Sequence, residues 1–252
     1  MTVPPLHLER AHLVVMTGAG VSAESGIPTF RDANGLWEKH PVEAVASPQG
    51  FERDPRLVWR FYSERRESAA RCSPNAGHEA LAAVERRLGD RFLLVTQNVD
   101  GLHARAGSKR LVELHGNLFT SRCSSAHCAT KPFFDERSYA AGELPQCVSC
   151  RALLRPHIVW FGEALEEASL LRFSAFLAAS QQQRAPIVYL ACGTSGLVQP
   201  AAGLVRAAKK AGAQAVLVNL DRPDNVDAFD RVELGKSGEI LPQLLGTLGA
   251  SP

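Results

Sequence analysis

Short apolar, β-branched runs recur along the chain, and most of them end at a glycine or a polar residue. They cover residues 12–17, 91–96, 111–114, 157–161, 187–192 and 215–219. Helical patterns alternate with them at residues 76–88, 164–180, 199–211 and 239–248. Asn75, just before the first helical pattern, is a candidate N-cap. Buried strands that alternate with helices predict an α/β fold with a Rossmann-like, doubly wound parallel sheet.

Polar clusters follow these apolar runs. Because parallel strands present their carboxyl ends at one edge of the sheet, we expect the clusters to converge on one nucleotide crevice. The clusters are Gly18 to Gly20, Gln97 to Asp100, His115, Gly193 to Ser195 and Asn219.

The first cluster has the spacing G-x-G-x-x-A, with Ala23 in the third position. Two glycines allow a tight turn and a close approach to a pyrophosphate, although a bare G-x-G also occurs in ordinary turns. A hydride-transferring dehydrogenase should place an acidic residue on a second strand about 20 positions later. Glu38 and Glu43 lie near that distance but on no strand pattern. The loop therefore indicates phosphate binding in another manner.

Four of the six cysteines form two closely spaced pairs, Cys123-x4-Cys128 and Cys147-x2-Cys150. Two such pairs are typical of a tetrahedral structural Zn²⁺ site, which leaves no open position for a substrate. Disulfides and free thiols are the alternatives, and His127 is a possible competing ligand. Cys72 and Cys192 lie outside the cluster, and we expect them to be packing residues.

Two segments interrupt the alternation and predict a smaller module formed by insertions. Residues 36–75 contain no strand run, although 55–71 has the spacing of a helix, and residues 120–155 hold the four cysteines. The Rossmann-like domain then comprises residues 1–35, 76–119 and 156–252. The smaller domain has a helical part at 36–75 and a zinc-ribbon part at 120–155.

The bulk properties exclude some classes of protein. The chain has 252 residues and a formal net charge of +2, which gives no support for binding to nucleic acid or a membrane surface. The N-terminal MTVPPLHLER has no signal-peptide pattern, and no stretch approaches the roughly 20 apolar residues that span a bilayer. We therefore expect a cytoplasmic protein, and the short termini favour a monomer.

Seven segments, in this order, resemble those of the sirtuin family over nearly the whole chain. They are G-A-G-V-S-A-E-S-G-I-P-T-F-R at 18–31, T-Q-N-V-D-G-L-H at 96–103, E-L-H-G-N-L at 113–118, the four cysteines, R-P-H-I-V-W-F-G-E at 155–163, G-T-S at 193–195 and V-N at 218–219. The resemblance implies an enzyme that consumes NAD to remove acyl groups from lysine side chains of proteins.

The resemblance also implies a role for each matching residue. His115 would be the general base, and Asn98 would also act in catalysis. Val159, Phe161, Gly162 and Glu163 would bind the substrate peptide as an added strand. The NAD site would comprise Gly18, Ala19, Gly20, Ala23, Phe30, Arg31, Gln97, Asn98, Asp100, Gly193, Thr194, Ser195, Asn219 and Ser237.

In the implied reaction the acyl oxygen attacks the anomeric carbon of the nicotinamide ribose, and nicotinamide leaves. His115 then helps the 2′-hydroxyl attack the resulting imidate. Water finally releases free lysine and 2′-O-acyl-ADP-ribose.

Tyr62 and Arg65 resemble the Y-x-x-R motif of class III sirtuins. In that class the two side chains bind a carboxylate at the far end of the acyl chain. Ala46 matches a position where the class has a small residue, and Thr29 also agrees with it. Gln199 departs from the class, which commonly has an aromatic residue there. The resemblance implies that succinyl, malonyl and glutaryl groups are good substrates, with acetyl also accepted.

Three alternatives remain at this stage. A zinc-bearing NAD dehydrogenase would change the absorbance of its cofactor, whereas a sirtuin releases nicotinamide. A binding protein with an inactive site would not need His115 and Asn98. Mono-ADP-ribosyl transfer would use the same NAD site.

Overall fold

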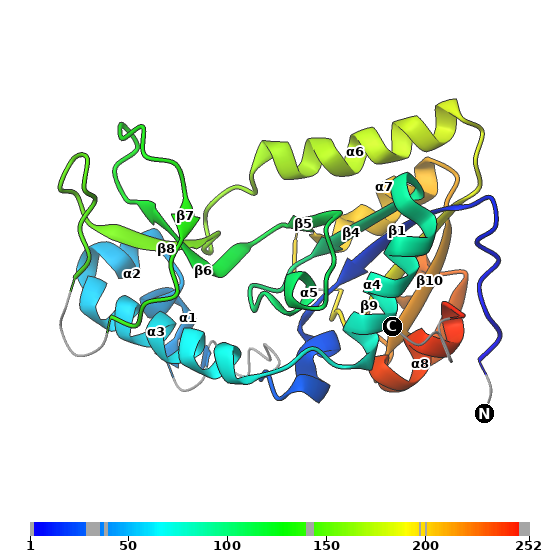
Figure 1. Ribbon diagram of the computed structural model, residues 1–252, viewed down its shortest axis with the longest axis horizontal. Coiled ribbons are helices and arrows are strands. Elements are labelled where there is room, and N and C mark those ends of the chain that lie inside the picture. Colours follow the sequence, from blue (N-terminus) through cyan, green and yellow to red (C-terminus); the bar gives the residue numbers. More distant parts are fainter. Residues whose placement is uncertain are drawn as a thin grey trace.

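The computed structural model describes residues 3–28, 36–37, 40–139, 144–196, 198–199 and 201–246. Its larger sheet has six parallel strands in the order β11-β10-β9-β1-β4-β5, with β1 in the middle (Figure 1). Numbered along the chain, this is the strand order of a doubly wound dinucleotide-binding sheet, so the predicted fold class is confirmed. The strands are β1 (His12–Thr17), β4 (Phe92–Thr96), β5 (Leu111–Glu113), β9 (Ile187–Cys192), β10 (Gln214–Asn219) and β11 (Arg231–Leu234).

Helices cover both faces of this sheet, because successive side chains of a strand point to opposite faces. Leu13 and Val15 of β1 pack in one apolar cluster with α4 (Ala76–Leu88) and α8 (Ser237–Leu244). Val14 and Met16 pack in another cluster with α6 (Glu167–Gln182) and α7 (Leu204–Lys210). Every residue of β1 is buried, as its unbroken apolar run predicts.

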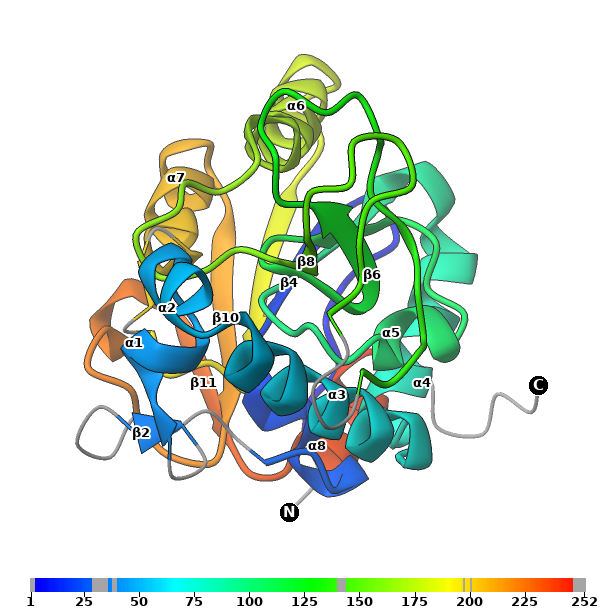
Figure 2. The ribbon, with the colours of Figure 1, turned by 90° about the vertical axis from the view of Figure 1, so that its left-hand side faces the viewer.

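A second, three-stranded antiparallel sheet has the order β7-β6-β8. Helix α3 lies beneath it in both views (Figures 1 and 2). Trp59, Phe61 and Tyr62 of α3 pack with Leu118 of β6 in a third apolar core. The elements of this part are β2 (Leu36–Trp37), β3 (His40–Pro41), α1 (Val42–Val45), α2 (Pro48–Arg53), α3 (Pro55–Arg71), β6 (Gly116–Cys123), β7 (Phe133–Phe134) and β8 (Leu154–Ile158). The predicted domain boundaries stay a prediction.

Short helical segments complete the described chain. They are η1 (Ala19–Ser25), η2 (Gly89–Arg91), α5 (Leu102–Arg105), η3 (Ala201–Gly203) and η4 (Val226–Ala228). Within the described ranges, no helix combines the length and the apolar character needed to cross a membrane.

Several predicted elements appear with the expected bounds. The helices at 55–71 and 76–88 correspond to α3 and α4. The Asn75 side chain caps α4 as predicted, since it accepts a hydrogen bond from Gly77 N at 2.9 Å. The other predicted helices begin and end a few residues from their expected positions.

The strand predicted at 157–161 was right only for His157 and Ile158, which end β8. The chain is extended only to Ile158, in β8, which pairs antiparallel with β6 and not with the parallel sheet. Beyond it the main chain bonds to loops: Val159 N donates to His115 O at 2.9 Å, and Phe161 N donates to Ala46 O at 3.0 Å. The apolar side chains of this run line a cavity. Their apolar character therefore reflects the wall of the cavity and not a buried strand.

Several strands were not predicted, among them the two-residue β7. β6 contains Asn117, Thr120 and Ser121, so its apolar alternation is weak. β11 is a short edge strand of half-buried and exposed residues. The two-residue strands β2 and β3 lie in the segment predicted to have none.

Gly116 joins His115 to β6 with φ of 82°, and an added Cβ would lie 1.9 Å from His157 O of β8. Gly116→Ala should therefore lower the free energy of unfolding by about 3 kcal/mol, measured in urea. Gly212→Ala is the matched control, because Gly212 has φ of 90° but no atom within 4 Å of an added Cβ. It should cost only about 1 kcal/mol. Equal losses would contradict a role for the close approach to β8.

Candidate active site

A cavity of about 640 Å³ lies where the segments after β1, β4, β9 and β10 meet α3 and the loop after β8. Nearly all of the predicted site residues line it. Phe30 and Arg31, with Thr29, lie outside the described residues. The predicted residues that line the cavity are Gly18, Ala19, Gly20, Ala23, Ala46, Tyr62, Arg65, Gln97, Asn98, Asp100, His115, Val159, Phe161, Gly162, Glu163, Gly193, Thr194, Ser195, Asn219 and Ser237.

The glycine loop after β1 packs directly against the loop after β9. Gly20 N donates to Gly193 O at 2.8 Å, and a Cβ on Gly20 would lie 2.7 Å from the Cα of Gly193. A Cβ on Gly18 would lie 2.8 Å from the same carbonyl oxygen. The contact between the two loops therefore requires glycine at both positions, whether or not a ligand is bound. The segment that follows, η1, is a 3-10 helix that ends at Gly26, in the left-handed conformation.

Asn98 and Asp100 are held by a buried serine. Asn98 Nδ2 donates to Ser22 Oγ at 3.1 Å, and Ser22 Oγ donates to Asp100 Oδ2 at 2.7 Å. Burial raises the pKa of Asp100, although hydrogen bonds from Leu102 N and Ser22 oppose the shift. Both amide and carboxyl groups are therefore fixed in a dry part of the cavity.

His115 lies at the start of β6, half-buried, with Nδ1 3.1 Å from Gln97 O. A carbonyl oxygen only accepts, so Nδ1 carries the hydrogen and Nε2 is left as the basic nitrogen. Burial lowers the pKa of His115, and the bond to Gln97 partly offsets this. The imidazole is consequently neutral near pH 7, as a general base requires.

The loops after β9 and β10 form another part of the cavity wall. Gln97 Nε2 donates to Thr194 Oγ1 at 3.2 Å, and Asn219 Nδ2 donates to Thr194 O at 3.1 Å. Ser237 Oγ, at the start of α8, accepts from Cys192 Sγ at 3.1 Å. Gln199 also lines the cavity here.

The loop after β8 is fixed by its own glutamate. Arg155 donates to Glu163 at 2.7 and 2.9 Å, and Arg122 donates to it at 3.2 Å. The Glu163 side chain also accepts from Trp160 N at 2.9 Å. The carboxylate of Glu163 thus shapes the loop, and its predicted contact with the substrate peptide stays a prediction. Phe161 is the large hydrophobic residue that this loop exposes.

Tyr62 and Arg65 lie one turn apart on α3 and line the same cavity. The fully buried Tyr62 hydroxyl accepts from Trp160 Nε1 at 2.9 Å. Arg65 donates to Phe61 O at 2.6 Å, and its guanidinium carbon stacks 3.3 Å from the centre of the Phe61 ring. Burial lowers the pKa of Arg65 to about 10, so it is still charged at neutral pH. Ala46, which is buried, leaves room beside them.

Comparison with known proteins decides the family. A sequence model of the Sir2 family matches residues 18–200. The chain is 46% identical over 241 residues to an NAD-dependent protein deacylase of Pasteurella multocida, which covers 94% of this chain and 97% of that protein. A Pyrococcus furiosus protein of the same name is 44% identical over 236 residues, covering 92% and 91%. The chain belongs to the Sir2 family.

Solved Sir2 structures agree with this sirtuin in fold. A Sir2 homolog–NAD complex superposes with a TM-score of 0.84 at 40% identity, covering 98% of this chain and 96% of that one. A complex of a Sir2 homologue mutant with ADP-ribose superposes with a TM-score of 0.83 at 42% identity, covering 94% and 91%.

The sirtuin's four clustered cysteines bring their sulfurs together in a metal-binding arrangement. The Sγ atoms all lie within 4.8 Å of one another, with 3.4 Å between Cys123 and Cys150 and 3.7 Å between Cys128 and Cys147. These distances exceed a disulfide bond of about 2.05 Å. Thiolates around tetrahedral zinc stand about 3.8 Å apart, since each Zn–S bond is about 2.3 Å. The donor set therefore fits one structural Zn²⁺.

Sequence reasoning missed the buried polar groups behind the cavity. Ser22 and His103 lay inside the quoted motifs but were not selected, and His78 was not considered. His103 Nε2 lies 2.8 Å from Thr17 Oγ1, and His78 Nε2 lies 3.3 Å from Ser22 Oγ. Burial lowers the pKa of His78 to about 4 and that of His103 to about 3, so both are neutral. In the sequence, these buried residues could have been found as polar residues that interrupt otherwise apolar segments.

The sirtuin purified without chelator should contain one zinc per chain by elemental analysis. Cys147→Ala should lose the metal and lower the Tm by about 5 °C or more, because bound metal stabilises only the folded chain. Cys72→Ala, which removes a cysteine outside the cluster, should retain both the zinc and most of the Tm. A Cys147→Ala variant with full zinc content would contradict the ligand assignment.

Proposed function

We propose that this cavity removes succinyl, malonyl and glutaryl groups from lysine side chains of proteins, and also acetyl groups, in a reaction that consumes NAD. Relatives named NAD-dependent protein deacylase match more than nine-tenths of the chain, and it is an enzyme of that kind. The acyl preference rests on one observation: Tyr62 and Arg65 line the same cavity as His115 and Asn98. This agrees with placement in class III of the sirtuins.

The acyl end of the cavity suits a carboxylate. A guanidinium pairs with a carboxylate through two parallel hydrogen bonds, and such charge-assisted bonds are stronger where water is excluded. Arg65 is largely buried yet charged, so an incoming carboxylate would meet it with little competing solvent. The Tyr62 hydroxyl would complete the receptor beside it.

The NAD end would use the residues of the parallel sheet. Gly18 and Gly20 would admit the pyrophosphate, and Asn98 and Asp100 would enclose the nicotinamide ribose. Nicotinamide would leave when the acyl oxygen of the bound lysine takes its place on the anomeric carbon. Nε2 of His115 would then accept the proton of a ribose hydroxyl as that oxygen attacks the acyl carbon. Water would release lysine and 2′-O-acyl-ADP-ribose.

The cellular setting is also a proposal. We propose that the enzyme works in the cytoplasm as a monomer on acylated proteins, without a nucleic-acid or membrane partner. The net charge of +2 supports the absence of a polyanionic partner. Size-exclusion chromatography with light scattering tests this oligomeric state, because the molar mass measured for a dimer would be twice that of one chain.

Mass spectrometry of the products separates this reaction from its alternatives. A succinylated peptide incubated with NAD should give nicotinamide, free lysine and O-succinyl-ADP-ribose. Transfer of ADP-ribose to protein would instead leave the succinyl group on the peptide. A dehydrogenase would leave the nicotinamide bond intact and change the cofactor's absorbance.

Arg65→Met should lower kcat/KM for a succinyl-lysine peptide by about 100-fold, the effect of losing a charge-assisted pair. The same variant should turn over an acetyl-lysine peptide within about 3-fold of the intact enzyme, because acetyl has no distal carboxylate. Arg71→Met, at the exposed end of α3, is the matched control and should change neither rate. An unchanged succinyl rate in Arg65→Met would refute the acyl assignment.

The pH dependence of kcat/KM should report His115. Because burial lowers its pKa, the neutral form persists to lower pH than in free histidine. Activity that needs neutral imidazole should therefore be constant near pH 7 and fall only below about pH 6.5, as pH passes through the lowered pKa. Tm measured over the same pH range serves as the control for unfolding. An acid limb centred above the ordinary histidine pKa would contradict the assignment.

A further inference from the structure

Helix α3 carries two adjacent stripes of functional side chains. Tyr62, Arg65 and Ala69 line the cavity. Trp59, Ser63 and Arg66 form the second stripe and bond to the three-stranded sheet and the segment that follows β7. At about 100° per residue the two stripes are centred roughly a quarter turn apart. Whatever fixes the second stripe therefore also fixes the direction in which the first one points.

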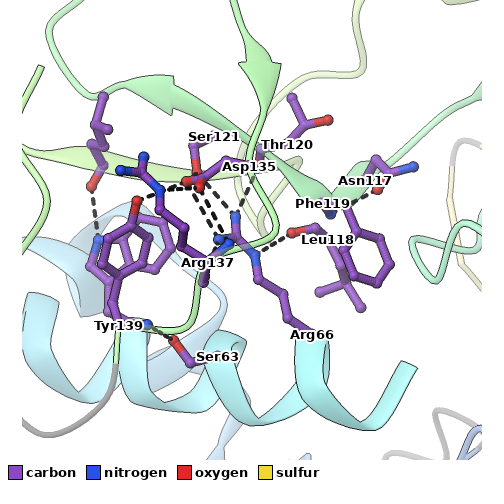
Figure 3. Close-up of polar contacts among 12 residues, drawn as sticks. Ser63, Arg66, Asn117, Leu118, Phe119, Thr120, Ser121, Asp135, Arg137 and Tyr139 are labelled. Carbon is purple, nitrogen blue, oxygen red and sulfur yellow. Dashed lines mark hydrogen bonds and ion pairs between the residues drawn. The ribbon is translucent and has the colours of Figure 1, made fainter. Parts of the chain in front are cut away.

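Arg66 makes most of the bonds in the second stripe (Figure 3). Although only 1% exposed, it donates to Leu118 O through Nε, to Arg137 O at 2.8 Å and to Ser121 Oγ at 3.0 Å. A weaker bond reaches Thr120 O at 3.5 Å. The guanidinium thus holds α3 to β6 by hydrogen bonds that point in different directions. A group with only one bond would leave the helix freer to rotate.

Asp135 supplies the opposite charge. Asp135 is 3% exposed, and its carboxylate lies 3.5 Å from Arg66 Nη1. Ser121 Oγ donates to it at 2.6 Å, Tyr139 OH at 3.0 Å and Arg137 Nε at 2.8 Å (Figure 3). Tyr139 N also donates to Ser63 Oγ of α3 at 2.8 Å. A buried pair with this many hydrogen bonds has one well-defined geometry.

We propose that Arg66 is a positioning residue for acyl selectivity: its bonds to β6 and Asp135 fix the rotation of α3 that aims Tyr62 and Arg65 into the cavity. The inference rests on the proposed function. A rotation of α3 by about 10° would move a guanidinium at the end of its side chain by about 1 Å. A displacement of about 1 Å is enough to lengthen a hydrogen bond beyond its favourable distance, so the hold on a distal carboxylate would weaken. An acetyl group would not sense this movement.

The test uses full-length Arg66→Lys, which keeps the charge beside Asp135 but loses the planar fork. KM for a succinyl-lysine peptide should rise about 10-fold, the order expected for one lost charge-assisted bond, with kcat little changed. Kinetics on an acetyl-lysine peptide and KM for NAD should stay within about 2-fold. The succinyl-to-acetyl ratio of kcat/KM should therefore fall.

Two controls separate positioning from general loss of structure. Arg71→Met changes an exposed arginine of α3 that takes no part in this network, so the ratio should not change. Leu177→Ala creates a cavity beneath α6, on the other sheet, and should lower the Tm without altering the ratio. If Arg66→Lys does not fold, Ser121→Ala and Tyr139→Phe, which each remove one bond to Asp135, are judged by the same ratio.

The outcomes are distinct. If the intact enzyme prefers succinyl, and Arg65→Met abolishes the preference while the Arg66 variant keeps it, the positioning inference alone is wrong. A proportional fall in both acyl rates would also overturn it, since that is a purely structural effect. If the intact enzyme has no preference and Arg65→Met changes nothing, the proposed function fails and this inference fails with it.

Discussion

The close contact between the loops after β1 and β9 shapes the crevice in which we propose that this protein binds its dinucleotide. The two strands are neighbours in the sheet, and the chain leaves them toward opposite faces. Gly20 and Gly193 approach so closely that neither tolerates a Cβ without displacing the other loop. The crevice at this switch point remains open beyond the contact, and the segments after β4 and β10 complete its walls. Binding of the dinucleotide therefore depends on a packing constraint between two loops that is satisfied before any ligand arrives.

Strand β6 connects the candidate active site to the smaller module, which holds the proposed acyl-recognition residues Tyr62 and Arg65. The strand begins directly after His115 and ends at Cys123 of the zinc cluster. Between these ends, its carbonyl oxygens accept hydrogen bonds from Arg66. Zinc bound at its far end would restrain a strand whose other end lies beside His115, the proposed general base. A structural metal distant from the reaction would in this way still affect it, through the rigidity of one strand.

Much of the fold could be predicted because its signals are local. The buried run of β1, the Asn75 cap and the helical spacing of α3 each depend on neighbouring residues, and each was predicted at the right place. β6 and β11 could not be, because half-exposed strands with polar residues lack clear alternation. The run 157–161 misled for the opposite reason: its apolar side chains are buried against a cavity, and burial alone does not distinguish a strand from a site.

The site divides in the same way between local and long-range information. The motif glycines, Asn98 and His115 are recognisable because each motif is contiguous in sequence. Arg66 and Asp135 are separated by a long stretch of chain, and only the fold brings them together. Arg65 and Arg66 are neighbours with nearly identical surroundings in sequence, yet one lines the cavity and the other is sealed beneath the small sheet. Under the proposed function, the rotation of one helix thus decides which of two adjacent arginines recognises the acyl group. If the positioning proposal holds, the residues that fix that rotation belong to the recognition site as much as those that touch the ligand.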